Sequence, residues 1–158
     1  EVFGLRWSDI NRRAAIFTVK DTKNGLPLEL PITETINEIF LLQQGRIASD
    51  FVFAAENEYG QIREPKKVVA RVKALSGTCC DFHDLRRTFR SLAASLGIAG
   101  NVAERCLNHK LKGVEGIYDR HDYFEERRAG LQQWADLLAE AERGFAEKVV
   151  PIKKRKFA

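Results

Sequence analysis

A hairpin near the start of the chain is the feature that most restricts its fold. Residues 14–19 and 26–32 are short runs dominated by aliphatic, aromatic and β-branched residues, and the turn Lys23-Asn24-Gly25 lies between them. Asn-Gly is the strongest short-range hairpin signal, because both residue types tolerate the positive φ that tight turns need. We therefore expect two antiparallel strands joined around this turn.

The rest of the chain is expected to be mainly helical. Pro65 is placed to begin a helix, and Gly97 and Gly100 mark a break between helices. With 158 residues, 44% of them apolar, the chain fits one domain with a real core. The expected fold class is α+β, mainly α-helical with a small antiparallel sheet near the N-terminus. Besides a helix that begins near Asp81, we expect helices over 34–45, 64–75, 101–107, 112–119 and 122–146, and a short strand over 51–53.

The cysteine count and the charge distribution narrow the class of protein. Three cysteines, two of them adjacent, cannot form the disulfide framework of an extracellular protein, and no apolar run approaches 18 residues. These features indicate a reducing compartment, the cytoplasm, and no membrane partner. The segment 148–158 carries five Lys and Arg residues and no acid, so residues 1–147 sum to −1 although the whole chain is +4. Nucleic-acid binding must therefore be argued from where the charges lie.

The helix expected near Asp81 separates apolar from basic residues. Asp81 is placed to cap it and Asp84 lies in its first turn, both favourable at the positive end of the helix dipole. A charged helix face is by default a solvated surface, so the basic side becomes informative only together with residues elsewhere. At 100° per residue one side carries Leu85, Phe89, Leu92, Ala93 and Leu96, and the other carries His83, Arg86, Arg87 and Arg90.

Four residues along the chain form an ordered set. Arg86 follows His83 by 3 positions, His109 follows Arg86 by 23 positions, and Tyr118 follows His109 by 9 positions. Together with the segments around them, these residues resemble the catalytic domain of the tyrosine recombinases, most closely the integrases of prophages and genomic islands. An HxxR pattern or a single Tyr occurs by chance in most proteins, whereas the ordered set at family spacing is specific.

The resemblance covers about the whole chain. Residues 1–10 are similar to the family's first conserved block, and residues 22–32 are similar to the hairpin that carries its active-site lysine, here Lys23. Residues 120–140, with Glu125-Glu126-Arg127-Arg128 and Trp134-Ala135, resemble the helix that follows the nucleophile in the prophage branch. Asn108 departs from the pattern, since it stands where the family usually has Gly. The implied fold is that of the DNA breaking-rejoining enzymes.

The resemblance implies a mechanism that suits these residue types. Tyr118 would be the nucleophile, because a phenol with a pKa near 10 is deprotonated more easily than Ser and is a better leaving group on reversal. Arg86 would clamp the non-bridging phosphate oxygens in bidentate fashion, and Lys23 would protonate the leaving 5′ oxygen. His83 and His109 would position the phosphate and take or hold the phenolic proton. The implied product is a 3′-phosphotyrosine, formed without a metal or any other cofactor.

The same resemblance implies the partners. The substrate would be double-stranded DNA at attachment sites, bound by a homotetramer with accessory DNA-bending or directionality factors. We expect a catalytic domain over 1–147 and a basic tail over 148–158. The family's first arginine normally lies three residues before the position of Glu1, so we expect that residue and an upstream DNA-clamping domain to lie outside this sequence. The residues expected to contact DNA are Arg87, Arg90, Lys66, Lys67 and Lys110.

Two other classes of function stay open on the sequence. One is a zinc site built from Cys79, Cys80, His83, Cys106 and His109, although adjacent cysteines are not the usual chelating pair. The other is a DNA-binding module without chemistry, supported by the basic tail and by Arg63, Lys66, Lys67, Arg71 and Lys73, which only Glu64 opposes.

The last expected helix carries an apolar stripe. By default this stripe is a core face, and its functional alternative is packing against a neighbouring protomer. Its members, at steps of 7, 3, 4, 3 and 4 residues, are Phe124, Leu131, Trp134, Leu138, Ala141 and Phe145.

Overall fold

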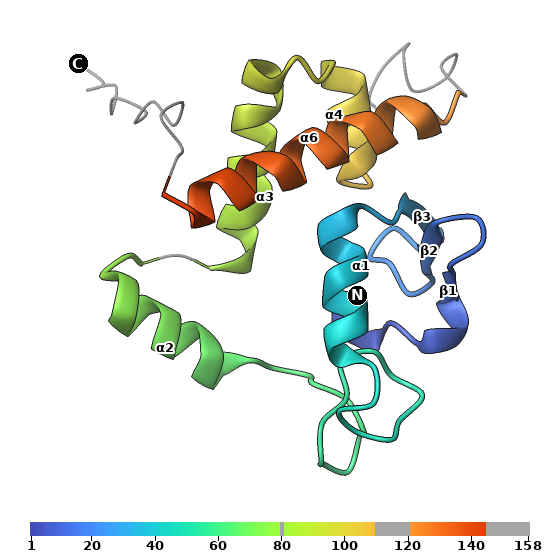
Figure 1. Cartoon of the computed structure of the whole chain (residues 1–158), viewed down its shortest axis with the longest axis vertical. Coiled ribbons are helices and arrows are strands. Elements are labelled where there is room, and N and C mark those ends of the chain that lie inside the picture. The colour runs from blue at the N-terminus through green and yellow to red at the C-terminus, as the bar shows by residue number, and fades with distance from the viewer. Residues whose placement is uncertain (80, 110–120, 145–158) are drawn as a thin grey trace.

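The computed structural model describes residues 1–79, 81–109 and 121–144 (Figure 1). These residues form a mixed fold of helices and one small antiparallel sheet, so the α+β class expected from the sequence is confirmed. The expected helix over 112–119 lies outside the described residues. In chain order the elements are η1 (Val2–Gly4), η2 (Trp7–Asp9), β1 (Ile10–Asn11), β2 (Ile16–Val19), β3 (Leu28–Pro31), α1 (Glu34–Gln43), α2 (Lys66–Ser76), α3 (Phe82–Ala93), η3 (Ala94–Leu96), α4 (Gly100–Cys106) and α6 (Phe124–Glu142).

The sheet has three strands in the order β1-β2-β3, and both pairings are antiparallel. The hairpin around Asn24-Gly25 exists, but its loop is longer than the predicted turn, since Val19 and Leu28 form the last pair of the ladder. Within the loop, the Gly25 N–H donates to the Thr22 carbonyl at 2.9 Å and the Thr22 hydroxyl donates to the Leu26 carbonyl at 2.6 Å. These local bonds close the turn in place of a continued ladder.

The predicted strand over 51–53 was wrong. Here the chain forms only isolated bridges, one between Arg6 and Phe51 and one between Ala54 and Gln61. The buried side chain in this stretch is that of Val52, which is 1% exposed and packs in the sheet core. The apolar character of residues 51–53 therefore reflects the burial of Val52 beside an isolated bridge and not a regular strand.

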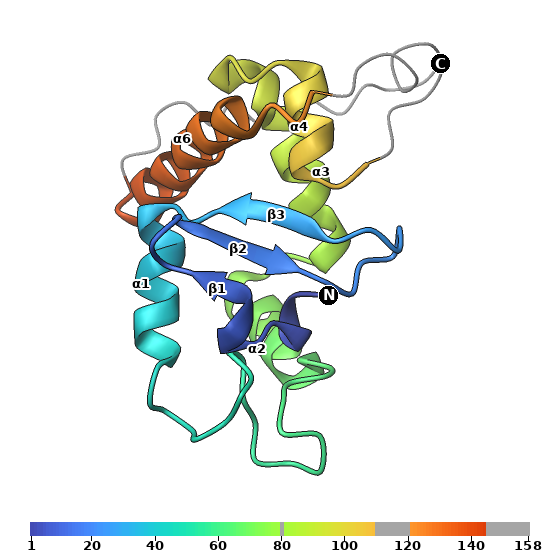
Figure 2. The same ribbon diagram turned by 90° about the vertical axis from the view of Figure 1, so that its right-hand side faces the viewer.

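Two clusters of buried side chains form the core. The first joins the sheet to α1, and its rings Phe17 and Phe40 meet edge to face with centroids 5.6 Å apart. The second joins α3, α4 and α6, where Phe89 meets Trp134 edge to face at 5.4 Å. Gly130 allows the close crossing of α6, since a Cβ there would lie 3.2 Å from Ile98. Figure 2 shows β3 as the strand nearest to this helical group.

The buried face of α6 differs from the predicted stripe. Leu131 and Trp134 do pack on the core, but Leu138 is 49% exposed and Ala141 is also exposed. Phe145 lies outside the described residues. The buried positions are Arg127, Gly130 and Ala135. The helix is therefore rotated from the predicted orientation, with Gly130 against Ile98 of the helical core and Arg127 against the Glu29 carbonyl of β3.

Helices α2 and α3 are among those that leave apolar side chains exposed. Leu85, on the apolar side of the helix expected near Asp81, is 60% exposed, because α3 packs on the helical core with its C-terminal half, through Phe89 and Ala93. Helix α2 lies apart from α3, α4 and α6 (Figure 1) and has no buried residue. Among the residues that the structure describes, no helix is long and apolar enough to cross a membrane.

Candidate active site

The first turn of α3 is fixed by a reciprocal cap, of which the sequence predicted the part made by Asp81. The Asp81 carboxylate accepts hydrogen bonds from the backbone of His83 at 2.7 Å and of Asp84 at 3.0 Å. The Asp84 carboxylate in turn accepts from the Asp81 N–H at 3.0 Å, and this bond lowers the pKa of Asp84. The cap decides where α3 begins, and with it the positions of His83 in the first turn and of Arg86 one turn further on.

An open pocket of about 690 Å³ lies where the hairpin loop, the start of α3 and the end of α4 meet. It brings together four of the five residues expected to carry the chemistry, although they come from three separate parts of the sequence. The pocket is lined by Glu1, Lys23, Asn24, His83, Arg86, Leu107, Asn108 and His109. An amine, a guanidinium and two imidazoles around one opening form a site that favours an anionic ligand.

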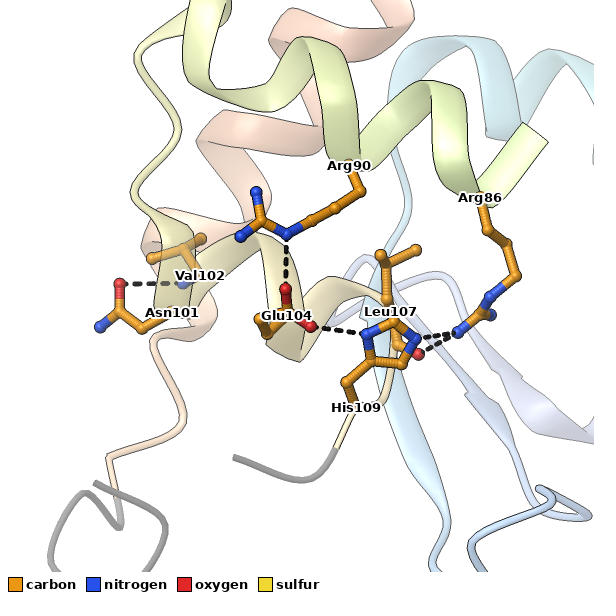
Figure 3. A network of polar contacts seen from close by, with 7 residues as sticks. All are labelled: Arg86, Arg90, Asn101, Val102, Glu104, Leu107 and His109. Carbon is orange, nitrogen blue, oxygen red and sulfur yellow. Dashed lines mark hydrogen bonds and ion pairs between the residues drawn. The ribbon is translucent and has the colours of Figure 1, made fainter. Parts of the chain in front are cut away.

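Arg86 and His109 are in direct contact in this pocket (Figure 3). The Arg86 Nη2 atom lies 3.0 Å from Nε2 of His109 and 2.5 Å from the Leu107 carbonyl, to which it donates. A guanidinium can only donate, so Nε2 of His109 is the acceptor and the ring proton belongs on Nδ1. The contact therefore holds the first turns of α3 against the segment that follows α4.

The Nδ1 atom of His109 faces a carboxylate that sequence reasoning did not single out. Glu104 Oε2 lies 2.6 Å from this nitrogen, and Oε1 of the same carboxylate accepts from Arg90 Nε at 2.5 Å. Burial raises the pKa of Glu104, but the hydrogen bonds from Arg90 and His109 outweigh it and leave the pKa below its ordinary value. The only sequence signal was an acid five residues before His109.

Asn108, at the position where the resemblance led us to expect Gly, adopts a left-handed backbone conformation. Its φ is +55°, in the left-handed region that Gly enters freely and that Asn tolerates better than most other residues. The Asn108 carbonyl accepts a hydrogen bond from the side chain of Asn24, which ties this turn to the hairpin loop. Asn108 thus brings the backbone before His109 close to the pocket without glycine.

Lys23 is placed in the pocket by its own backbone. Its N–H donates to Glu1 Oε1 at 2.7 Å, and the neighbouring Asn24 side chain is held by the Asn108 carbonyl. The hairpin loop is therefore anchored on both sides of the opening. This anchoring makes the Lys23 side chain a lining residue of the pocket instead of a free loop residue.

Two curated prophage integrases of Escherichia coli (strain K12) resemble this chain. Prophage integrase IntA is 26% identical over 150 residues, which cover 91% of this chain and 36% of IntA. Prophage integrase IntF is 26% identical over 115 residues, which cover 70% of this chain and 25% of IntF. The chain is similar to prophage integrases. It spans about a third of the length of IntA and about a quarter of the length of IntF.

The other comparisons found nothing. No protein-family model matches the chain, and no solved structure matches it at a significant level.

Several expected residues lie away from this pocket or outside the described residues. Tyr118 and Lys110 are in the segment 110–120, and the basic tail 148–158 is also outside the described parts. Lys66 and Lys67 lie on α2, where Lys66 pairs with Glu64 at 2.6 Å. Arg87, on the first turns of α3, pairs with Asp84 at 3.1 Å.

The zinc alternative has little geometric support. In the described ranges, no three His, Cys, Asp or Glu side chains gather closely enough to hold a metal ion, and Cys80 lies outside these ranges. Burial raises the pKa of the Cys106 thiol to about 11, which disfavours the thiolate that a zinc ligand requires. Cys79 is exposed at the surface.

Proposed function

We propose that this chain is the catalytic domain of a tyrosine-type site-specific recombinase that integrates and excises a prophage or genomic island. The observation that supports the proposal is the pocket in which Lys23, His83, Arg86 and His109 lie together. The similarity to two prophage integrases supports the same function. The domain occupies residues 1–147, the segment 148–158 is a basic tail, and the enzyme acts in the cytoplasm.

In the proposed reaction the Tyr118 hydroxyl attacks a phosphodiester of the DNA backbone. A bond forms between the phenolic oxygen and phosphorus, and the bond from phosphorus to the 5′ oxygen breaks. The phenolic proton passes to an imidazole of the pocket, and Lys23 gives a proton to the leaving 5′ oxygen. The 3′-phosphotyrosine keeps the energy of the broken bond, so a 5′ hydroxyl of the partner strand can reverse the step.

The pocket residues share the charge of the transition state in this proposal. Arg86 offers several donors in a fixed planar fork, which suits the non-bridging oxygens of a phosphate. His83 and His109 flank Arg86 and orient the same phosphate. The proposal assigns neither a metal nor any other cofactor to the reaction.

The proposed partner is double-stranded DNA at attachment sites, bound by a tetramer with accessory DNA-bending or directionality factors. Lys66 and Lys67 on α2, together with Arg87 and Lys110, would contact phosphates and so add affinity without sequence preference. The ion pairs of Lys66 and Arg87 are exposed and can exchange for phosphate contacts at little cost.

Covalent capture of DNA tests the proposal. The full-length natural protein is incubated with nicked attachment-site DNA and the products are separated under denaturing conditions. We expect an adduct that Tyr118→Phe abolishes while DNA binding stays within a small factor, since only one oxygen is lost. Of the other two tyrosines in this sequence, Tyr59→Phe and Tyr123→Phe should both retain the adduct.

The outcomes separate the alternatives. DNA binding without any adduct in the unmodified protein would support the module without chemistry. An adduct that survives in Tyr118→Phe and is lost in Tyr123→Phe would assign the nucleophile to Tyr123.

A further inference from the structure

Glu104 joins two basic side chains that come from different elements. At the end of α4 its Oε1 atom accepts from Arg90 Nε of α3 at 2.5 Å, and its Oε2 atom lies 2.6 Å from Nδ1 of His109 (Figure 3). Glu104 is partly buried, with 27% of its side chain exposed, whereas Arg90 at 44% and His109 at 45% are more exposed. Each oxygen of the carboxylate therefore has its own partner.

The chemistry of these contacts determines the tautomer of His109. An ionised carboxylate can only accept hydrogen bonds, so the neutral imidazole must carry its proton on Nδ1, toward Glu104. Nε2 is then left with a lone pair, which faces Arg86 at 3.0 Å in the pocket. The opposite tautomer would place a proton between Nε2 and a guanidinium that also donates, and it would leave Nδ1 facing a carboxylate without a proton between them.

Arg90 makes this arrangement rigid. Its bond to Oε1 restricts rotation of the Glu104 carboxylate, so Oε2 remains directed at His109. The hydrogen bonds from Arg90 and His109 lower the pKa of Glu104 against the opposing effect of burial, and the carboxylate stays ionised near neutral pH. An ion pair that only joined α3 to α4 would need no second bond to a pocket residue.

We propose that Glu104, held by Arg90, is a positioning residue that fixes His109 with its proton on Nδ1 and its Nε2 lone pair in the pocket. The catalytic consequence rests on the proposed recombinase function. During cleavage Arg86 donates to the phosphate and no longer to Nε2 of His109, so the phenolic proton of Tyr118 can move to Nε2, and the resulting imidazolium is stabilised by the negative charge of Glu104. In this proposal Arg90 binds the Glu104 carboxylate instead of a DNA phosphate, so it does not have the role of a DNA contact that we expected from the sequence.

The tautomer can be measured independently of any reaction. In the full-length natural protein labelled with ¹⁵N at histidine, the ring nitrogens of His109 are assigned by their loss in His109→Gln. Above the titration range of imidazole we expect a protonated Nδ1 and an unprotonated Nε2. Glu104→Ala should shift this ring toward the Nε2-protonated form, and Glu140→Ala, an exposed glutamate of α6, should leave it unchanged.

The folding of each variant is checked by its unfolding midpoint and its backbone amide spectrum. Because Glu104→Ala also removes the ion pair to Arg90, Glu104→Gln provides a second variant of the same shape that keeps one acceptor oxygen but not two. In Glu104→Gln the His109 ring should populate both tautomers. The proposal would be overturned by a His109 ring that is Nε2-protonated in the unmodified protein. It would also be overturned if the His109 tautomer were the same in both folded variants as in the unmodified protein.

Cleavage rates test the catalytic consequence on the nicked DNA described above. Glu104→Ala should lower the single-turnover cleavage rate by about 10- to 100-fold, by analogy with the loss of a partner that orients a metal-bound histidine. DNA affinity should change little. Arg90→Ala should cause a smaller loss, and the double variant should be no slower than Glu104→Ala alone, because Arg90 acts through Glu104.

These results distinguish this inference from the function on which it rests. If the unmodified protein forms no adduct, the recombinase proposal fails, whereas the tautomer result still decides the role of Glu104. If Arg90→Ala instead weakens DNA binding, reduces its salt dependence and adds to the loss in Glu104→Ala, Arg90 contacts phosphate and the positioning role assigned to it is wrong.

Discussion

The buried Arg127 of α6 donates a hydrogen bond of 2.8 Å from Nη1 to the Glu29 carbonyl of β3. Its Nη2 atom binds the Asp122 carboxylate at 2.6 Å and its Nε atom binds the Asp122 carbonyl at 3.1 Å. One side chain, 2% exposed, therefore fastens the sheet, the helix α6 and the segment just before that helix. A buried guanidinium with this many partners is a structural clamp.

Arg127→Met should destabilise the fold by about 2–4 kcal/mol, because it removes three hydrogen bonds and leaves the Glu29 carbonyl without this donor. Arg127→Lys should recover only part of this loss, since an ammonium cannot reach the three acceptors with the geometry of the planar fork. Chemical denaturation measures both. The matched control is Arg128→Met on the same helix, whose pair with Glu125 at 3.3 Å is more exposed and should be worth less than about 1 kcal/mol. Equal losses at the two positions would contradict the clamp.

Arg86→Lys should lower the rate of covalent DNA capture by about 10²–10³-fold, because a point charge cannot replace planar donors directed at a phosphate. DNA affinity should remain within a small factor. The assay is single-turnover cleavage of nicked attachment-site DNA by the full-length natural protein, with Arg143→Lys near the end of α6 as the control. A full rate in Arg86→Lys would remove Arg86 from the proposed phosphate site.

Asn108 offers a test of backbone strain next to His109. Asn108→Ala should cost about 1–2 kcal/mol, since a residue with a Cβ and no polar side chain is disfavoured at the observed φ of +55°. Asn108→Gly should be neutral or slightly stabilising by the same reasoning. Thermal unfolding of the three proteins gives the order. If Gly were the least stable of them, a contact of the Asn side chain, and not its backbone conformation, would be the important feature.

Asp9 makes the stability of the fold depend on acid pH. Burial raises the pKa of Asp9, but the hydrogen bonds from Lys20 at 2.5 Å and from the Arg6 N–H at 3.1 Å outweigh it, and the pKa lies below the ordinary 3.8. A lowered pKa in the folded state means that Asp9 stabilises the fold above pH 3.8 and that this contribution is lost as the pH falls through the folded-state value.

The free energy of unfolding should therefore fall more steeply for the unmodified protein than for Asp9→Asn as the pH drops from 3.8 toward the lower pKa of folded Asp9. The two curves, measured by denaturation at a series of pH values, should converge in acid. Asp50→Asn, at an exposed carboxylate, is the control and should keep the steep dependence. Parallel curves for Asp9→Asn and the unmodified protein would show that Asp9 does not carry this dependence.

Features that depend on neighbours within a turn or two were predictable from the sequence. The cap of Asp81 on α3, the hairpin near Asn24 and the start of α2 after Pro65 were all predicted, because their causes are local hydrogen bonds and fixed dihedral angles. The length of the hairpin loop was not predicted, since it depends on whether each residue after the turn finds a partner in the ladder.

Contacts between residues far apart in the sequence became evident only in the folded structure. Arg127 is buried because the Glu29 carbonyl, 98 residues away, accepts its hydrogen bond, and no pattern within α6 contains that information. Glu104 likewise has its partners on α3 and on the segment after α4. Its position in the sequence is equally consistent with an ordinary charge on an exposed surface. Periodicity and capping act over a few residues, whereas the pairing of buried polar groups depends on which distant atoms the fold brings within about 3 Å.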